Sequence, residues 1–322
     1  RLRRRPPLTD VAGARVAGSS GRVLGAFGVL CVVWGSTYLA IRIGVTEFPP
    51  ALFAGVRFLI AGGLLLGAAR LLGRRLPARR RDWVTNAVVG CLLLFCGNGL
   101  VVWAEQFTPS GVAAIFVVTV TLWLALFDAV IPGSAARPTW RQVAGLFVGF
   151  GGTLLLVDAD LGALREADWR GPLALTTAAA AWALGSVFST RRPSEASPEI
   201  NSALQMLTGG VLLTVLGFLL GEVGQVHWSP RGAGALAYLI VFGSLVGYSS
   251  YVYVLRHMAP AVVGTYSYVN TVVAVLLGWA ILAEPITRRT VAAMAVVLGS
   301  VAWVRRASRR PVAPAKSPSA AR

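Results

Sequence analysis

Long apolar runs separated by short polar or proline-containing breaks dominate the chain. A helix needs roughly 20 apolar residues to cross the hydrocarbon core of a bilayer. The membrane interior offers no water to backbone groups, and the alternating pattern of a transmembrane barrel is absent, so these runs are expected to be helices. Ten runs qualify, at 23–43, 51–72, 84–104, 111–131, 140–157, 171–190, 199–220, 234–255, 260–283 and 288–304. We therefore predict an all-α membrane protein with ten transmembrane helices.

The first two runs meet at the sequence Glu47-Phe48-Pro49-Pro50. Proline cannot continue a hydrogen-bonded helix and disfavours helical geometry in the residue before it, so this break predicts a tight helical hairpin. The first run is about as long as a full span and lacks a small-residue cleavage site. We therefore expect an uncleaved first helix rather than a signal peptide.

Composition and charge support a polytopic membrane protein and set its orientation. Hydrophobic residues make up 56% of the chain, charged residues 13%, and the mean hydropathy is +0.68. The net charge of +17 is concentrated in the tails and one loop, which argues against nucleic-acid binding. With both termini in the cytoplasm, the inner segments carry 23 Lys and Arg and the outer segments five. The basic tails 1–22 and 305–322 are expected to be cytoplasmic and disordered.

The chain also contains an internal repeat. Residues 107–120 (FTPSGVAAIFVVTV) align with residues 258–270 (MAPAVVGTYSYVN), and Gly35-Ser36 is echoed by Gly185-Ser186. The alignment predicts two five-helix repeats, 23–157 and 171–304, joined by an external linker at 158–170. Because five is odd, the second repeat must be inverted relative to the first. Inverted repeats build transporters whose substrate site lies near the membrane midplane between the halves.

Several motifs carry a resemblance to a known family. These are the sequence WGSTY at 34–38, the segment FAGVRF at 53–58 that follows the Pro-Pro hairpin, and AEPIT at 283–287. They resemble EamA-type members of the drug/metabolite transporter superfamily, over nearly the whole chain apart from the tails. The resemblance implies a ten-span secondary carrier that mostly exports amino acids, their derivatives or other small metabolites. The chain departs from the family pattern in one respect. Glu284 has no acidic counterpart in the first half, where the sequence PGS stands at 132–134.

Trp34 and Tyr38 in the first span are four residues apart and share one helical face. They are candidates to line a substrate cavity, the alternative being an aromatic belt at the membrane interface. Arg42, on the same face at the outer end of the span, is expected to belong to that belt.

Two further polar stripes lie in the fourth and ninth spans. Thr119 and Trp123 form one, and Tyr266 and Asn270 form the other. The repeat alignment places Thr119 opposite Asn270. Polar positions that recur in two halves are the pattern that a midplane site leaves.

Asn98 lies in an otherwise apolar third span, and the repeat alignment places it opposite Ser249. Because an amide in lipid needs a partner, this face is expected to point inward. Tyr248, Tyr251 and Tyr268 are secondary candidates. The predicted substrate-binding residues are Trp34, Tyr38, Asn98, Thr119, Trp123, Ser249, Tyr266 and Asn270.

Three charged residues are candidates for coupling or gating. Arg57, inside the second span, is expected either to bind a substrate carboxylate or to pair with an acid such as Glu47 or Glu105. Glu105, at the outer mouth, is either a proton carrier or simply solvated. Asp128, deep in the fourth span, is either a proton-coupling group or a partner of Arg137.

The sequence carries little that suggests an enzyme. Cys31, Cys91 and Cys96 lack metal-ligand spacing, and His227 and His257 are predicted in loops. There is no phosphate-binding loop, zinc-protease motif or serine elbow, so no cofactor or metal is expected. An intramembrane enzyme and a non-transporting scaffold or sensor remain the alternatives to a carrier.

The glycine pairs Gly145/Gly149 and Gly243/Gly247 follow the small-xxx-small rule and predict close helix packing. The expected partners are a small metabolite and the lipid bilayer, with a proton as one candidate coupling ion. We expect a multi-pass protein of the cell membrane, the inner membrane in bacteria. Substrate identity and oligomeric state are left open by the sequence.

Overall fold

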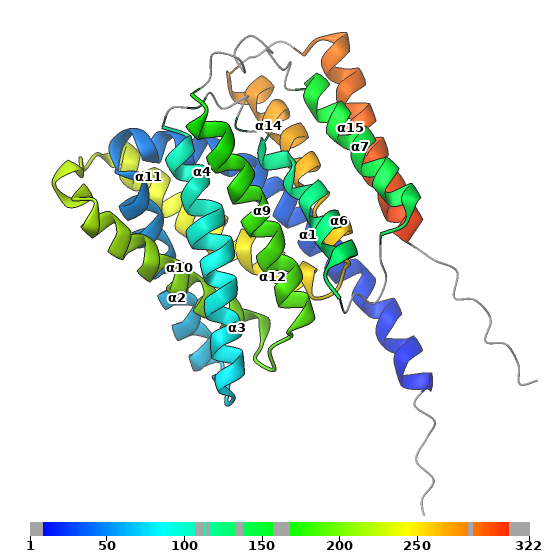
Figure 1. Ribbon diagram of the computed structural model, residues 1–322, viewed down its shortest axis with the longest axis horizontal. Helices are drawn as coiled ribbons and strands as arrows, with labels where there is room; N and C mark the ends of the chain where they lie inside the picture. The colour runs from blue at the N-terminus through cyan, green and yellow to red at the C-terminus, as the bar shows by residue number, and fades with distance from the viewer. Residues whose placement is uncertain are drawn as a thin grey trace, which may run out of the picture.

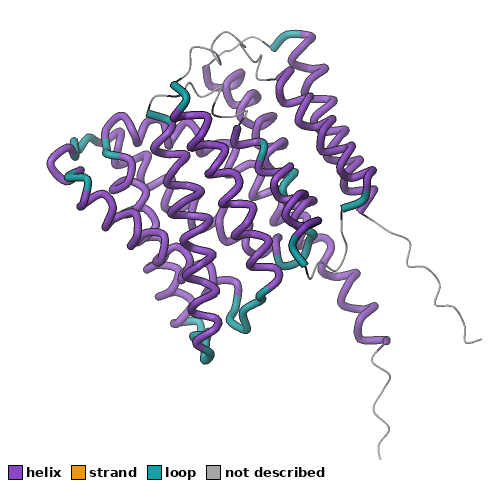
Figure 2. The backbone as a smooth tube through the Cα atoms, in the orientation of Figure 1, coloured by secondary structure: helices purple, strands orange, loops and turns teal. Residues whose placement is uncertain are grey.

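A computed structural model describes residues 9–106, 108, 113, 116–132, 138–156, 168–282 and 286–308 (Figure 1). Side chains at 9–20, 38, 39, 42, 278, 281 and 282 are not described. Over the described residues every regular element is a helix (Figure 2). The elements are α1 (Thr9–Glu47), α2 (Pro50–Leu71), α3 (Arg80–Gly90), η1 (Cys91–Asn98), α4 (Gly99–Ala104), α6 (Val120–Val130), α7 (Trp140–Leu156), α9 (Arg170–Arg191), α10 (Pro198–Leu219), η2 (Glu222–Gln225), α11 (Pro230–Tyr238), η3 (Leu239–Tyr248), α12 (Ser249–Leu255), α13 (Pro260–Val263), α14 (Tyr266–Leu282) and α15 (Arg288–Ser308).

Seven helical stretches of the described chain are long and apolar enough to cross a membrane. They coincide with seven of the ten predicted runs. The other three runs overlap α1, α6 and α7, whose described apolar parts are shorter than a full span. The all-helical membrane fold is therefore confirmed, and the number of ten spans stays a prediction.

Proline marks the start of several helices. Pro50, Pro198, Pro230 and Pro260 each lie in the first turn of their helix, where a missing N–H costs nothing. The α1–α2 hairpin turns between Glu47 and Pro50, as the sequence predicts. The start of α2 also receives a cap that the sequence does not reveal. The buried carboxylate of Glu222 accepts hydrogen bonds from the backbone N–H groups of Ala51 (3.3 Å) and Leu52 (2.8 Å).

Both basic tails are more helical than predicted. Helix α1 already begins at Thr9, and α15 continues to Ser308, so the inner ends of the predicted disordered tails extend the outer helices. In the C-terminal case a contact explains the extension, since Gln142 Nε2 donates to Ser308 Oγ at 2.6 Å. Arg305 also lies over the ring of Phe27, 5.8 Å from its centroid.

Helix packing has the same pattern when the two halves of the chain are exchanged. Helix α2 packs against α10, and α7 packs against α15, as the adjacent ribbons in Figure 1 show. The contacts of α1 with α14 and η3 match those of α9 with α6 and η1. When runs one to five are exchanged with runs six to ten, the α2–α10 and α7–α15 pairs map onto themselves. The contacts of α1 map onto those of α9 in the same exchange. This is the packing expected of two structurally similar halves related by a pseudo-two-fold axis.

Two π-helical segments occupy corresponding places in the halves. The third predicted run contains η1, which ends at Asn98, and the eighth contains η3, which ends at Tyr248. Such segments are rare and occur frequently at functional sites. Their common position directs attention to the space between these two helices.

Candidate functional site

A cavity of about 110 Å³ lies between the halves, lined by residues of α1, α2, η1, α4, α6, α9, η3 and α14. Five of the main sequence-predicted site residues line it, namely Trp34, Arg57, Asn98, Tyr266 and Asn270, as does the secondary candidate Tyr248. These residues are spread over more than two hundred positions of sequence. The fold therefore brings the first, second, third and ninth predicted runs together at one site.

Aromatic side chains form much of the wall. The Trp34 ring lies 5.2 Å from that of Tyr266 in an edge-to-face arrangement and stacks on Tyr251 at 5.3 Å. Trp182 meets Trp34 edge to face at 5.5 Å, and its indole N–H donates to the hydroxyl of Tyr251 at 3.0 Å. These contacts hold the rings in place, so the aromatic wall is formed before any ligand arrives.

Trp182 is a cavity residue that sequence reasoning missed. It follows a run of alanines, two of which, Ala178 and Ala179, also line the cavity. A large ring that follows several alanines on one helix can form the edge of a hollow above the small side chains. This pattern in the sequence could have identified Trp182 as a cavity residue. Thr37 and Tyr248 complete the polar part of the wall.

The other predicted residues lie elsewhere. Thr119 Oγ1 donates to the backbone oxygen of Phe116 at 2.5 Å, and Trp123 stacks on Phe127 with 5.6 Å between ring centroids. Glu105 is half-buried at the end of α4, away from the cavity lining. The side chains of Tyr38 and Arg42, and the residues Arg137 and Glu284, lie outside the described part of the chain.

Ser249 does not line the cavity, whereas its neighbour Tyr248 does. Asn98, which the repeat alignment places opposite Ser249, lines it too. The buried hydroxyl of Ser249 has no hydrogen-bond partner among the described residues.

Arg57 does not have the acidic partner that the sequence analysis considered for it. Its side chain is 5% exposed, and its Nε donates to Ser244 Oγ at 2.9 Å. The guanidinium also lies over the ring of Phe58, 4.9 Å from the centroid. Within the described part of the chain it forms no ion pair, neither with Glu47 nor with Glu105. The reason is that α2 turns this face toward η3, which supplies a hydroxyl rather than a carboxylate.

The glycines of η3 make room for two cavity residues. A Cβ atom at Gly243 would lie 2.7 Å from Arg57 Nη2, and one at Gly247 would lie 2.3 Å from Trp34 Nε1. The indole N–H of Trp34 donates to the carbonyl of Gly243 at 3.0 Å. The predicted role of this pair in close packing is therefore specific, because it seats an arginine and a tryptophan at the wall.

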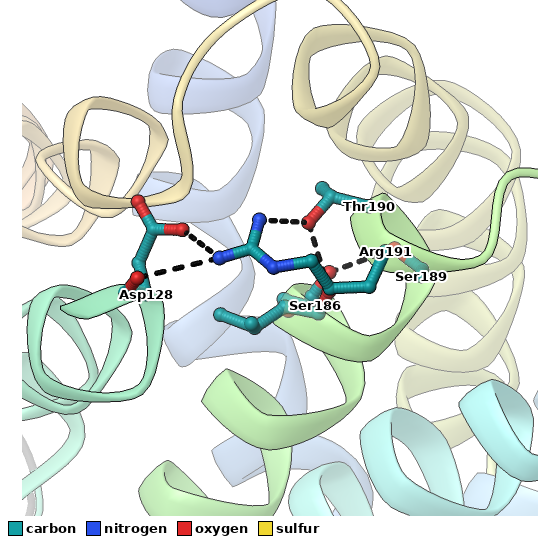
Figure 3. Close-up of polar contacts among 6 residues, drawn as sticks. Asp128, Ser186, Ser189, Thr190 and Arg191 are labelled. Carbon is teal, nitrogen blue, oxygen red and sulfur yellow. Dashed lines mark hydrogen bonds and ion pairs between the residues drawn. The ribbon is translucent and has the colours of Figure 1, made fainter. Parts of the chain in front are cut away.

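A buried ion pair joins the two halves at one end of the molecule. Arg191 Nη2 donates to Asp128 Oδ1 at 2.5 Å and to the Asp128 carbonyl at 3.3 Å. Figure 3 shows the Arg191 side chain reaching from the end of α9 to Asp128 on α6. The Asp128 side chain is 1% exposed and that of Arg191 is 14% exposed. The described partner of Asp128 is thus Arg191, which the sequence placed in a loop after the sixth run.

A second cavity, of about 320 Å³, lies beside the first and is lined by α3, α10, α12 and the segment after α9. A chain of hydrogen bonds crosses from one cavity to the other. Tyr248 donates to Gln205 (2.8 Å), Gln205 to Asn86 (2.9 Å), and Asn86 to Asn201 (2.9 Å). Tyr248 lines the first cavity and the three amides line the second. The tyrosine is therefore part of the partition between the two spaces.

Two arginines, Arg192 and Arg256, lie at the wall of this second cavity. Burial lowers the pKa of the Arg256 guanidinium, and the nearby Glu199 carboxylate partly opposes that shift. Arg256 also donates to the carbonyl of Ala196 at 3.1 Å. In the described part of the chain, no cluster of three or more His, Cys, Asp or Glu residues could hold a metal ion.

Comparisons with known proteins agree with this architecture. Residues 23–158 and 169–306 match the model of the EamA-like transporter family. A protein named uncharacterized inner membrane transporter YedA, from Escherichia coli K12, is 37% identical over 283 residues, covering 88% of this chain and 90% of its own. The uncharacterized transporter YvbV of Bacillus subtilis is 24% identical over 280 residues, covering 87% and 90%.

A solved crystal structure shares the fold. It aligns with a TM-score of 0.74 at 22% identity, covering 90% of this chain and 99% of the other. The family match covers both halves of the chain, and the YedA relative exceeds 30% identity over most of both proteins. The family match and the YedA relative also indicate that the protein is a membrane transporter. The chain belongs to the EamA-like transporter family.

Proposed function

We propose that the protein is a secondary carrier that exports small metabolites, such as amino acids or their derivatives, by alternating access between two inverted repeats. The observation that carries this proposal is the central cavity, whose wall comes from both halves of the chain. A site between two halves can be exposed to either side when one half rocks against the other. Its walls offer aromatic rings, amides and one arginine, which suits a small amphipathic solute.

The Asp128–Arg191 ion pair supports a gate at one end of the pathway. It links the first half to the second, and the positive-inside orientation predicts that this end faces the cytoplasm. Rocking toward an inward-open state separates α6 from α9 and breaks the pair. A carboxylate released from its arginine can accept a proton, so proton coupling through Asp128 is linked to opening in this scheme.

Reconstitution tests the carrier itself. Purified protein is reconstituted into liposomes, and the liposomes are loaded with one unlabelled metabolite at a time from a broad panel. Uptake of the same metabolite in labelled form into the liposomes is then measured. We expect accelerated counterflow for at least one small metabolite relative to empty liposomes. Absence of flux across a broad panel, with correctly inserted protein, would favour a scaffold or sensor. Conversion of a metabolite into a new product would favour an enzyme.

Two substitutions test the site. Asn270, with its amide oriented to satisfy its neighbours, donates to the carbonyls of Tyr266 (3.0 Å) and Cys31 (2.9 Å), so it ties α14 to α1. We expect Asn270→Ala and Tyr266→Phe to reduce transport while membrane insertion stays normal. Trp123→Phe, outside the cavity, is the matched control and should transport at the wild-type rate. Normal transport by both cavity variants would remove this site from the pathway.

Coupling and topology have separate tests. Asp128→Asn should abolish any accumulation of substrate driven by a pH gradient, while substrate exchange continues. An unchanged proton dependence would exclude Asp128 as the coupling residue.

Reporter fusions at both termini should be active only in the cytoplasm. A periplasmic signal from either terminus would contradict the predicted orientation.

A further inference from the structure

Arg57 is a buried cation without a counterion in the described part of the chain. It is the single charged side chain among the described residues that line the central cavity. A charge inside a membrane protein is costly unless a partner, water or a ligand compensates it. Asp128 and Arg191 compensate each other at the gate, but the partner of Arg57 is a neutral hydroxyl.

Arg57 lines the cavity, and its guanidinium keeps hydrogen-bonding capacity at its terminal nitrogens. Ser244 occupies Nε, and the ring of Phe58 supports the planar group from one side. Neither terminal nitrogen makes a hydrogen bond to a described residue, and Gly243 leaves the space that Nη2 needs. Two adjacent N–H groups in one plane match the two oxygens of a carboxylate.

The remaining wall favours a flat or apolar body attached to that carboxylate. Trp34, Trp182 and Tyr266 supply ring faces and edges. No Asp or Glu occurs among the described lining residues of this cavity, so a cationic group would meet Arg57 without compensation. The buried Oδ1 of Asn98 has no partner in the described structure and can accept one hydrogen bond from a ligand.

The neighbouring cavity has the same sign of charge. Arg192 and Arg256 lie at its wall, and its described lining likewise contains no carboxylate. Cavities lined by one sign of charge concentrate ligands of the opposite sign. Both cavities therefore have arginine side chains, and no described carboxylate, at their walls.

We propose that the central cavity selects a small organic carboxylate with a flat or apolar body, and that Arg57 is its anchor. This inference rests on the carrier function proposed above, because it names the substrate class of that same cavity. It excludes purely cationic solutes and ranks neutral ones below their carboxylate analogues.

Three probes of similar size and different charge test the proposal. Benzoate, benzamide and benzylamine are titrated into the purified full-length protein in detergent micelles, with binding followed by tryptophan fluorescence and calorimetry. We expect benzoate to bind at least about ten-fold more tightly than benzamide, as a charge-assisted contact implies. Benzylamine should show no saturable binding. Equal affinities, a preference for benzylamine or no binding of any probe would overturn the proposal.

Variants assign the selectivity to Arg57. Arg57→Gln should bring the affinity for benzoate down to that for benzamide. Arg57→Lys, which keeps the charge and loses the planar fork, should retain only part of the preference. Arg70→Gln, on an exposed turn of the same helix, is the control and should bind like wild type. Wild-type selectivity in a folded Arg57→Gln protein would contradict the assignment, and if that variant fails to fold, the wild-type probe series and Arg57→Lys still decide.

Binding and flux separate the two proposals. If benzoate binds selectively but no metabolite moves across liposomes, the substrate class stands and the carrier function fails. If Arg57→Gln transports an organic carboxylate at the wild-type rate, the carrier function stands and the carboxylate anchor fails.

Discussion

An arginine lines the central cavity and another forms the ion pair with Asp128, but the two charges are compensated in different ways. Arg191 donates to the Asp128 carboxylate at 2.5 Å, whereas Arg57, which lines the cavity, donates to the Ser244 hydroxyl at 2.9 Å. An ion pair holds two helices together. Removing one of its two charged groups leaves the other without compensation in a low-dielectric interior. An unpaired charge beside a cavity contributes little to stability and is available to a ligand. The comparison therefore separates an arginine paired with a carboxylate from one that is bonded to a neutral hydroxyl at a cavity wall.

The largest expected effect comes from breaking the pair at the gate. Asp128→Ala leaves Arg191 buried without its carboxylate and should lower the free energy of unfolding by about 3–5 kcal/mol. Arg57→Gln should lower it by less than about 1 kcal/mol, since no described ion pair is lost. Unfolding of both purified variants in one detergent measures the difference. Equal losses would show that Arg57 is as structural as Arg191.

A smaller effect is expected from the glycine that seats Trp34. In Gly247→Ala the new methyl group would lie 2.3 Å from Trp34 Nε1, so the rigid indole must shift. Overpacking of this kind costs about 1–3 kcal/mol, and the change should also weaken ligand binding in the cavity. Thermal unfolding and probe titration measure the two effects.

The control for that change is Gly234→Ala on the helix leading into η3, where a methyl group meets nothing within 4 Å. It should stabilise the protein by up to about 1 kcal/mol through helix propensity. A Gly247→Ala protein as stable as this control would mean that the cavity wall adapts more easily than the contacts suggest.

The partition between the cavities should respond more weakly. Tyr248→Phe removes the hydrogen bond to Gln205 and should cost about 1 kcal/mol. It should also raise the leak of solute through the carrier, measured as efflux from preloaded liposomes. Tyr253→Phe is the matched variant, because the Tyr253 hydroxyl has no recorded hydrogen bond in the described structure. An unaltered leak in Tyr248→Phe would place the partition elsewhere.

The smallest effect belongs to a third arginine. Arg79 pairs with Glu195 at 2.8 Å, but the two side chains are 65% and 64% exposed. Glu195→Gln should change the unfolding free energy by about 0.5 kcal/mol or less, and high salt should remove even that. A loss comparable to that of Asp128→Ala would show that burial does not set the value of these pairs.

Sequence reasoning identified five of the cavity residues because amphipathic and polar groups in apolar runs have few reasons to be there. It failed at Ser249 and Trp182 for different causes. Ser249 was chosen from the repeat alignment, but its neighbour Tyr248 lines the cavity, because weak similarity between the halves does not fix which side of a helix faces inward. Trp182 was overlooked because the contacts that place it at the cavity, with Trp34 and Tyr251, are made with residues that are distant in the sequence.

The membrane class, seven of the apolar spans and the proline-marked turn between the first two runs were determined by the sequence alone. Run length and proline geometry are local properties, and water-free lipid leaves the backbone only one way to satisfy its hydrogen bonds in such runs. The partners of the buried charges were decided by the tertiary structure. Arg57 finds Ser244 across 187 residues, and Arg191 finds Asp128 across 63. Such pairings depend on which faces of distant helices meet, and no local pattern carries that information.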